Sequence, residues 1–312
     1  MVIVVHVLVI LVCCGALWLG ATWLVDSAAR IARRVGVSDL VIGLTVVAFG
    51  TSAPEFAATI GASLQNKPDI SVGNVVGSNI FNIGFILGAC AIVEAIKTKS
   101  SLIWRDGMFL LAISVLLVVM LWDLELGRIE GAVLASMLVG YLLFLFWKRE
   151  AVMDEEISHE PPRSRDGLLL LGGLSLVAGG GHFLVASAEA VAVTYGVPEW
   201  TIGMTVVAAG TSVPEFAISM IALIKKHHGI SAGNLIGSNL FNTLGVLGVA
   251  GLIRPLAVAP TAQGSIIAQV VLTLVVVIFM ATGKKVTRPE GIVLVLLSLA
   301  IWAYNFTTGQ PG

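Results

Sequence analysis

The chain has 312 residues, of which 57% are hydrophobic and only 12% are charged, and its formal net charge is −1. A soluble domain carries roughly twice that fraction of charged residues, so the composition excludes an ordinary soluble protein and indicates one embedded in lipid. The near-zero net charge gives no reason to expect a nucleic-acid partner.

Apolar segments long enough to cross a hydrocarbon core of about 30 Å recur along the whole sequence. We predict ten transmembrane helices, at about residues 2–24, 36–64, 70–95, 107–123, 128–147, 166–188, 198–224, 230–253, 264–282 and 288–306. A polar stretch rich in Glu, Pro and Arg follows the fifth helix. The predicted fold is therefore an all-α integral membrane protein with a five-helix half at 1–150, a linker at 151–165 and a second five-helix half at 166–312.

The basic residues are distributed unevenly among the loops that join these helices. Odd-numbered loops hold 15 of the 18 Lys and Arg residues, whereas even-numbered loops hold only Lys67, Arg128 and Arg254. Because positive residues accumulate in cytoplasmic loops, we expect the odd loops and the linker in the cytoplasm, and both termini outside the cell or in the periplasm. The membrane is then the cell membrane, either plasma or inner.

Two segments of the sequence are copies of each other. Residues 43–88 match residues 203–248 without a gap, at a constant offset of 160 and with 24 identities in 46 positions. Five predicted helices separate equivalent positions, and five is odd, so the second copy enters the membrane from the opposite side. An inverted-topology repeat of this kind is typical of secondary transporters.

Each copy places a carboxylate within a long apolar span, Glu55 in the first and Glu215 in the second. An ionised carboxylate at the bilayer centre costs about 2.5 kcal/mol or more, so it indicates a functional site. A paired or snorkelling carboxylate is the structural alternative, but no Lys, Arg or His stands near either residue in the sequence. The repeat predicts that the two glutamates meet near the midplane.

Pro54 and Pro214 predict how the helix breaks beside each glutamate. Proline has no N–H and clashes with the preceding turn, so the helix should restart with Ser52 or Ser212 as its N-cap. We expect the break to free carbonyls around 48–51 and 208–211. Carbonyls, hydroxyls and a carboxylate form a hard oxygen set that suits Ca²⁺ and Na⁺.

A second repeated motif lies about one predicted helix further on. Ser78 and Asn82 are one helical turn apart on one face, as are Ser238 and Asn242. These side chains would complete the cavity, although each alone could be ordinary interhelical hydrogen bonding, and the preceding glycines allow close helix approach or a second break. Other acids near helix ends, among them Asp106, are expected to have solvated or interfacial roles. His227 and His228 are expected in a solvated loop.

The two motifs together resemble a known family. They are GTSAPE at 50–55 with GSNIFN at 77–82, and GTSVPE at 210–215 with GSNLFN at 237–242. They resemble the α-repeats of the cation/calcium antiporter superfamily, in particular its prokaryotic sodium/calcium exchangers. The resemblance covers nearly the whole chain, but the short linker has no room for a large cytoplasmic regulatory domain.

The resemblance implies a site residue by residue. It implies that Glu55, Glu215 and the carbonyls of Thr51 and Thr211 hold Ca²⁺. The implied sodium and central ligands are the hydroxyls of Ser52, Ser212, Ser78 and Ser238, the carbonyls of Ala48 and Ala208, and the amides of Asn82 and Asn242. Some relatives carry Asp where this chain has Asn242, and the resemblance ties that acid to potassium use in the potassium-dependent members. Its absence here favours a potassium-independent exchanger.

Several functions stay open at this point. Sodium/calcium antiport by alternating access, with an electrogenic cycle, fits the serines best, because hydroxyl ligands serve Na⁺ and are idle for H⁺. The two glutamates also permit proton/calcium antiport, and a passive cation channel is a further rival. No nucleophile with a positioned base is visible, so we expect no enzyme. We expect no cofactor and no obligate protein partner besides the transported Ca²⁺ and Na⁺ and the lipid bilayer.

Overall fold

The structure, a computed structural model, describes residues 2–148, 163–195, 208–260 and 262–308. The helices of the first half are α1 (Val2–Val35), α2 (Asp39–Ile42), η1 (Gly43–Val47), α3 (Ala48–Thr51), α4 (Ala53–Leu64), α5 (Pro68–Ile80), η2 (Phe81–Ile86), α6 (Leu87–Val93), η3 (Leu102–Gly107), α7 (Met108–Met120) and α8 (Arg128–Lys148). Those of the second half are α9 (Asp166–Thr194), α11 (Ala208–Gly210), α12 (Val213–Ile224), α13 (His228–Leu240), η6 (Phe241–Val246), α14 (Leu247–Ile253), α15 (Ala262–Ala281) and α16 (Arg288–Thr308). The η segments are π-helical turns continuous with their neighbours.

The membrane-spanning character is confirmed, but the count of ten spans is not. Within the described residues, seven helices are long and apolar enough to cross a membrane, or eight if the pair 39–51 and 53–64 is one bent span. The expected span at 198–224 lies partly outside the described residues, and α12 within it has 12 residues. The expected span at 288–306 corresponds to α16.

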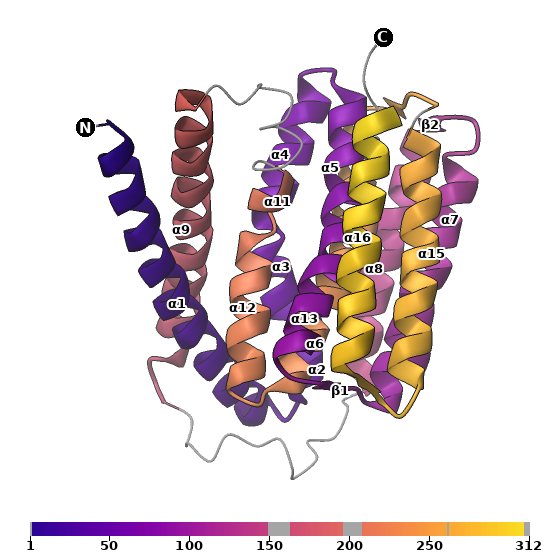
Figure 1. Cartoon of the computed structure of the whole chain (residues 1–312). Helices are drawn as coiled ribbons and strands as arrows, with labels where there is room; N and C mark the ends of the chain where they lie inside the picture. Colours follow the sequence, from indigo (N-terminus) through magenta and orange to yellow (C-terminus); the bar gives the residue numbers. More distant parts are fainter. Residues whose placement is uncertain (1, 149–162, 196–207, 261, 309–312) are drawn as a thin grey trace.

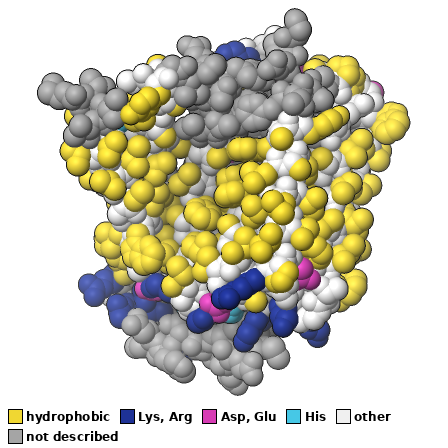
Figure 2. Space-filling model, in the orientation of Figure 1, with side chains coloured by type: hydrophobic (Ala, Val, Ile, Leu, Met, Phe, Trp, Pro, Cys, Tyr) yellow, Lys and Arg dark blue, Asp and Glu magenta, His cyan; other side chains and the backbone are white. Residues whose placement is uncertain are grey.

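The outer surface is apolar around the middle of the molecule and basic at one end. Large hydrophobic side chains such as Leu11, Val119 and Leu168 are more than half exposed, as expected for positions that face lipid. Figure 2 shows this apolar band, with Lys and Arg gathered below it. The protein is therefore a multi-pass membrane protein.

Helices α1 and α9 lie side by side at one flank of the broken helices, and α15 and α16 lie on the other side (Figure 1). Helices α1 and α9 approach each other closely because glycines lie at their contact. A Cβ added to Gly20 would lie 2.8 Å from the carbonyl oxygen of Gly173, and one added to Gly173 would lie 2.6 Å from that of Gly20. Small residues at a crossing let two membrane helices approach in this way.

Two pairs of short strands join the two halves of the chain. Strands β1 (Ile96–Lys97) and β4 (Lys285–Val286) pair antiparallel, as do β2 (Glu125–Leu126) and β3 (Leu256–Ala257). At the offset of 160, β1 is equivalent to β3 and β2 to β4, so each pair joins the two halves. The first pair lies at the lower end of the molecule and the second at the upper end (Figure 1). Equivalent strands therefore lie at opposite ends.

Two close helix contacts made by glycines, called glycine crossings here, are also equivalent in the two halves. A Cβ on Gly88 would lie 2.7 Å from the Gly291 carbonyl oxygen, and one on Gly131 would lie 2.7 Å from that of Gly248. The offset of 160 converts the first pair into the second.

The described part of α1 begins, and that of α16 ends, at the upper end, whereas α8 ends and α9 begins at the lower end (Figure 1).

Candidate functional site

The first glutamate lies just beyond a bend in its helix. Helices α3 and α4 meet at Ser52, and the axis turns by 46° there. Pro54 occupies the first turn of α4, directly before Glu55, as the sequence predicts. In the second half α12 has the same arrangement, with Ser212 before it and Pro214 in its first turn.

The serines stand at the predicted N-cap positions but do not act as caps. Neither Ser52 nor Ser212 makes a side-chain cap hydrogen bond to its own helix. Instead the Ser52 hydroxyl donates to Glu215 Oε1 at 3.3 Å, and the Ser212 hydroxyl donates to Glu55 Oε1 at 3.1 Å. Each break therefore directs a hydroxyl to the carboxylate of the other half, so both glutamates lie where the two halves contact each other.

The helix break was expected to free the carbonyl of Ala48, but this carbonyl is hydrogen-bonded. It accepts a hydrogen bond from the Ser52 N–H at 3.1 Å and lies 3.2 Å from the Thr51 hydroxyl. The helix thus holds its hydrogen bond up to Ser52, and the missing donor is that of Pro54, one turn after Gly50. In the second half, the Ser212 N–H donates to the Ala209 carbonyl, and Ala208 is the first residue of α11.

The hydroxyls of the two repeats surround the carboxylates. The Ser238 hydroxyl donates to Glu215 Oε1 at 3.4 Å and lies 3.2 Å from the Thr51 hydroxyl. The Ser78 and Thr211 hydroxyls are 3.5 Å apart. Helices α5 and α13 run unbroken through Gly77 and Gly237, so the second break that these glycines permit is not formed. A Cβ at Gly237 would lie 2.8 Å from the Leu44 carbonyl, which explains that glycine by close packing.

Four buried oxygen atoms of the site have no hydrogen-bond partner, namely Oε2 of Glu55, Oε2 of Glu215, Oδ1 of Asn82 and Oδ1 of Asn242. All four side chains have an exposed fraction of zero. Buried polar atoms are almost always paired, because leaving one unpaired costs free energy. Each atom is an oxygen acceptor, and each half contributes one carboxylate and one amide.

The chemistry of these donors fits a hard cation. Among the described residues, no ion pair joins either glutamate to Lys, Arg or His. The same residues contain no group of three His, Cys, Asp or Glu side chains that could hold a transition metal. Carboxylate, amide and hydroxyl oxygens without nitrogen or sulfur ligands suit Ca²⁺ or Na⁺.

Two asparagines that the sequence analysis did not single out support the glutamates. Asn74 Nδ2 donates to the Glu55 carbonyl at 3.4 Å and to the Thr59 hydroxyl at 3.0 Å. Asn234 Nδ2 donates to the Glu215 carbonyl at 3.4 Å and to the Ser219 hydroxyl at 3.0 Å. The available signal was that an asparagine stands at this position in both repeats, three residues before the second motif begins.

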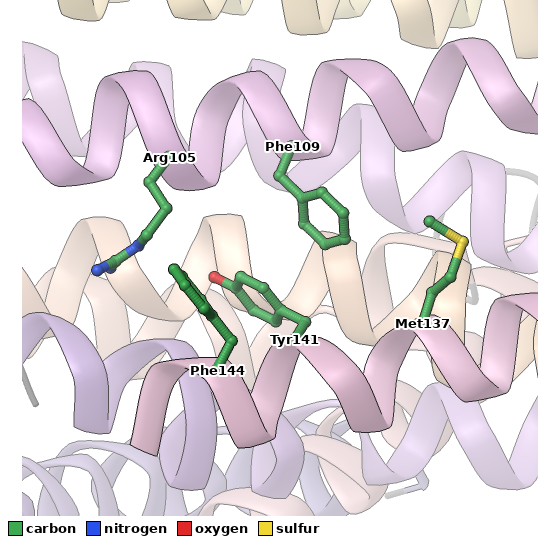
Figure 3. Close-up of a pocket in the computed structure, with 5 residues that line it drawn as sticks. All are labelled: Arg105, Phe109, Met137, Tyr141 and Phe144. Carbon is green, nitrogen blue, oxygen red and sulfur yellow. The ribbon is translucent and has the colours of Figure 1, made fainter. Parts of the chain in front are cut away.

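Asp106 does not have the solvated role that was one of its two expected roles. Asp106 is fully buried, receives two hydrogen bonds from Arg105 at 2.7 and 2.8 Å, and accepts one from the Tyr141 hydroxyl at 2.8 Å. Arg105 and Tyr141 also line a cavity of about 320 Å³ with Phe109, Met137 and Phe144 (Figure 3). Its walls are mainly apolar and none of them belongs to the repeats, so it is separate from the ion site.

The loop with His227 and His228 was also expected to be solvated, but its side chains contact the rest of the protein. His227 Nδ1 lies 2.6 Å from Asp39 Oδ2, and His228 is buried. Lys226 donates to both oxygens of Glu94, at 2.7 and 2.6 Å, and this hydrogen bond lowers the pKa of Glu94. The loop between α12 and α13 is therefore fastened to the first half of the chain.

Comparisons with known proteins agree with this geometry. A family model described as "Sodium/calcium exchanger protein" matches residues 5–147 and 167–307. The chain is 32% identical to the sodium/calcium exchanger MaX1 of Methanosarcina acetivorans, over 92% of this chain and 94% of that one. It is 35% identical to the inner membrane protein YrbG of Escherichia coli K12, over 77% of each chain. A solved structure of the sodium-calcium exchanger NCX_Mj superposes with a TM-score of 0.86 at 31% identity, over 97% of this chain and 99% of that one.

Proposed function

The chain belongs to the sodium/calcium exchanger family, and from that premise we propose that it is a secondary active antiporter that exchanges Na⁺ for Ca²⁺ across the cell membrane. The observation that carries the proposal is the set of four buried, unpaired oxygens from Glu55, Glu215, Asn82 and Asn242. Two carboxylates match the charge of one Ca²⁺. Bound cations would give these oxygen acceptors the partners that the protein itself does not supply.

We propose the remaining ligands from the resemblance to the exchanger family. The carbonyls of Thr51 and Thr211 lie at the two helix breaks and join the glutamates around Ca²⁺. The hydroxyls of Ser52, Ser212, Ser78 and Ser238 and the carbonyls of Ala48 and Ala208 serve Na⁺. Because those hydroxyls already contact the carboxylates or the neighbouring threonines, a small cation could replace these hydrogen bonds without a large rearrangement.

We infer ten membrane crossings in two inverted halves. The support comes from equivalent strands at opposite ends of the molecule and from the two glycine crossings related by the offset of 160. The basic end in Figure 2 is then cytoplasmic, with the linker, and both termini lie on the other side. In such a fold, one half rocks against the other around a central site and exposes it to each side in turn.

Uptake into proteoliposomes tests this function. Purified protein in vesicles loaded with Na⁺ should accumulate radioactive calcium when diluted into sodium-free medium. Vesicles loaded with choline and given only a pH gradient should not accumulate it. Uptake driven by the pH gradient alone would favour proton/calcium antiport, and uptake with neither gradient would indicate a channel.

A further inference from the structure

Four asparagines lie at the contact between the two repeats. Asn79 and Asn82 belong to α5 and η2, Asn239 and Asn242 belong to α13 and η6, and all four are fully buried. Only Asn82 and Asn242 leave an oxygen without a partner. The other two use their side chains entirely within the protein, so their role differs.

An asparagine amide offers a cation either its oxygen or its NH₂ group, and only the oxygen can bind. Asn82 Nδ2 donates to Asn239 Oδ1 at 3.2 Å. Asn239 in turn donates from its Nδ2 to the backbone carbonyl of Asn79 at 3.2 Å. A backbone carbonyl can only accept, so it fixes the orientation of Asn239, which fixes that of Asn82. The Asn82 oxygen is thereby left facing away from this chain of hydrogen bonds.

Asn242 is held in the same way, in a second arm of hydrogen bonds that ends at a different acceptor. Asn242 Nδ2 donates to Asn79 Oδ1 at 3.2 Å, and Asn79 Nδ2 donates to the Thr243 hydroxyl at 2.9 Å. The position equivalent to Thr243 in the first half is Ile83, which cannot accept a hydrogen bond, so Asn239 uses a carbonyl instead. A hydroxyl can donate or accept, and this arm is the less strictly fixed of the two.

We propose that Asn79 and Asn239 are positioning residues that hold the amide oxygens of Asn242 and Asn82 toward the transported cation. Each acts across the interface, because Asn79 orients a residue of the second half and Asn239 orients one of the first. The proposal rests on the proposed function, since it assumes that the two oxygens are cation ligands. Groups that orient metal ligands in this way are typically worth about 10- to 100-fold in metal affinity.

A double-mutant cycle on calcium binding tests the proposal. Calorimetric titration of purified, sodium-free protein should give a Kd for Ca²⁺ that rises about 10- to 100-fold in Asn239→Leu. In an Asn82→Ala background, which lacks the oriented oxygen, Asn239→Leu should add little further loss, because the two residues act through one ligand. Asn239→Asp should bind nearly as well as wild type, since a neutral carboxylic acid can both accept from Asn82 and donate to the Asn79 carbonyl.

Thr273→Val is the matched control, because the Thr273 hydroxyl is buried and donates only within its own helix, to the Gln269 carbonyl at 2.7 Å. It should leave the Kd unchanged. If Asn239→Leu is not recovered folded, Thr243→Val gives the same cycle in the other arm against Asn242→Ala. Equal losses from Asn239→Leu in both backgrounds, or an unchanged Kd, would overturn the proposal. Either of these two results could occur while the wild type still shows sodium-driven calcium uptake. If the proposed function itself is wrong, the wild type will show no such uptake.

Discussion

Glu55 and Glu215 each combine complete burial with one unpaired carboxylate oxygen. Glu55→Gln and Glu215→Gln keep the shape of the side chain and remove its charge. Removing one partner of a buried charge pair costs about 2–5 kcal/mol, so calcium affinity should fall about 30-fold or more. Sodium-driven calcium uptake in proteoliposomes should therefore be nearly abolished in each variant, with the elution profile in detergent unchanged.

Glu94→Gln is the matched control for this prediction. Glu94 follows α6 at the basic end, where Lys226 holds it. Its loss should leave uptake close to wild type. Near-normal uptake by both Glu55→Gln and Glu215→Gln would show that the ion site lies elsewhere.

At the level of single residues, the sequence predicted the polar centre but not its hydrogen bonds. Both glutamates and the flanking serines could be found from the repeat and the cost of polar residues in lipid. Whether Ser52 would cap its own helix or reach Glu215 depends on how the two halves meet, which local sequence does not specify. Asn79 and Asn239 were missed because a buried asparagine usually indicates ordinary interhelical bonding.

At the level of elements, the helix break depends on proline. Pro54→Ala or Pro214→Ala restores a backbone N–H that can donate one turn back and lets the helix run straight. We expect uptake to fall about tenfold, because a misplaced ligand set commonly costs more than about 1.4 kcal/mol. The melting temperature in detergent should hold or rise.

Pro68→Ala is the control for the proline variants. Pro68 is in the first turn of α5, where the missing N–H has no partner in its own helix. This variant should transport normally. Wild-type uptake by Pro54→Ala and Pro214→Ala would mean that the breaks do not organise the site.

Glycine crossings should govern stability rather than transport chemistry. A Cβ at Gly291 would lie 2.6 Å from the Gly88 carbonyl, so Gly291→Ala should destabilise the fold by about 1–3 kcal/mol through overpacking. Gly140 has open space where a Cβ would be, and Gly140→Ala should be neutral or stabilising by up to about 1 kcal/mol. Melting in detergent compares the two. Equal melting temperatures would contradict the close approach of α6 and α16.

Long helices were predictable from apolar length, whereas short strands were not. The pairs β1 with β4 and β2 with β3 join residues far apart in the sequence, and strands of two residues leave no periodic pattern. The π-helical turns η2 and η6 were also missed. They begin at Phe81 and Phe241, directly before Asn82 and Asn242, where such turns often mark functional sites.

At the scale of the whole molecule, the apolar surface agrees with the predicted membrane protein, whereas the expected linker at 151–165 lies largely outside the described residues. The count of ten spans remains a proposal, because residues 198–207 lie outside the described residues and α12 is short. The inverted relation of the two halves, which we predicted from the odd number of helices between the repeats, is part of the same proposal. The direct contacts between the halves required the three-dimensional arrangement.

We predict that the exchange cycle is sensitive to voltage because of the charge balance at the proposed site. There, one Ca²⁺ would neutralise Glu55 and Glu215, whereas sodium ions bound at several hydroxyl sites would exceed that charge. A membrane potential then acts on the cycle with about 2.3 kcal/mol per elementary charge per 100 mV. An inside-positive potential, set with potassium and valinomycin, should accelerate calcium entry into sodium-loaded proteoliposomes. A rate independent of the potential would indicate an electroneutral cycle.

Competition between the two ions at the paired glutamates is the central claim, and equilibrium calcium binding measures it directly. Titration of sodium-free protein with Ca²⁺ should give one site per chain, weakened progressively by added NaCl but not by choline chloride, and lost in Glu55→Gln and Glu215→Gln. Calcium binding that ignores Na⁺, or that persists unchanged in both variants, would contradict the account.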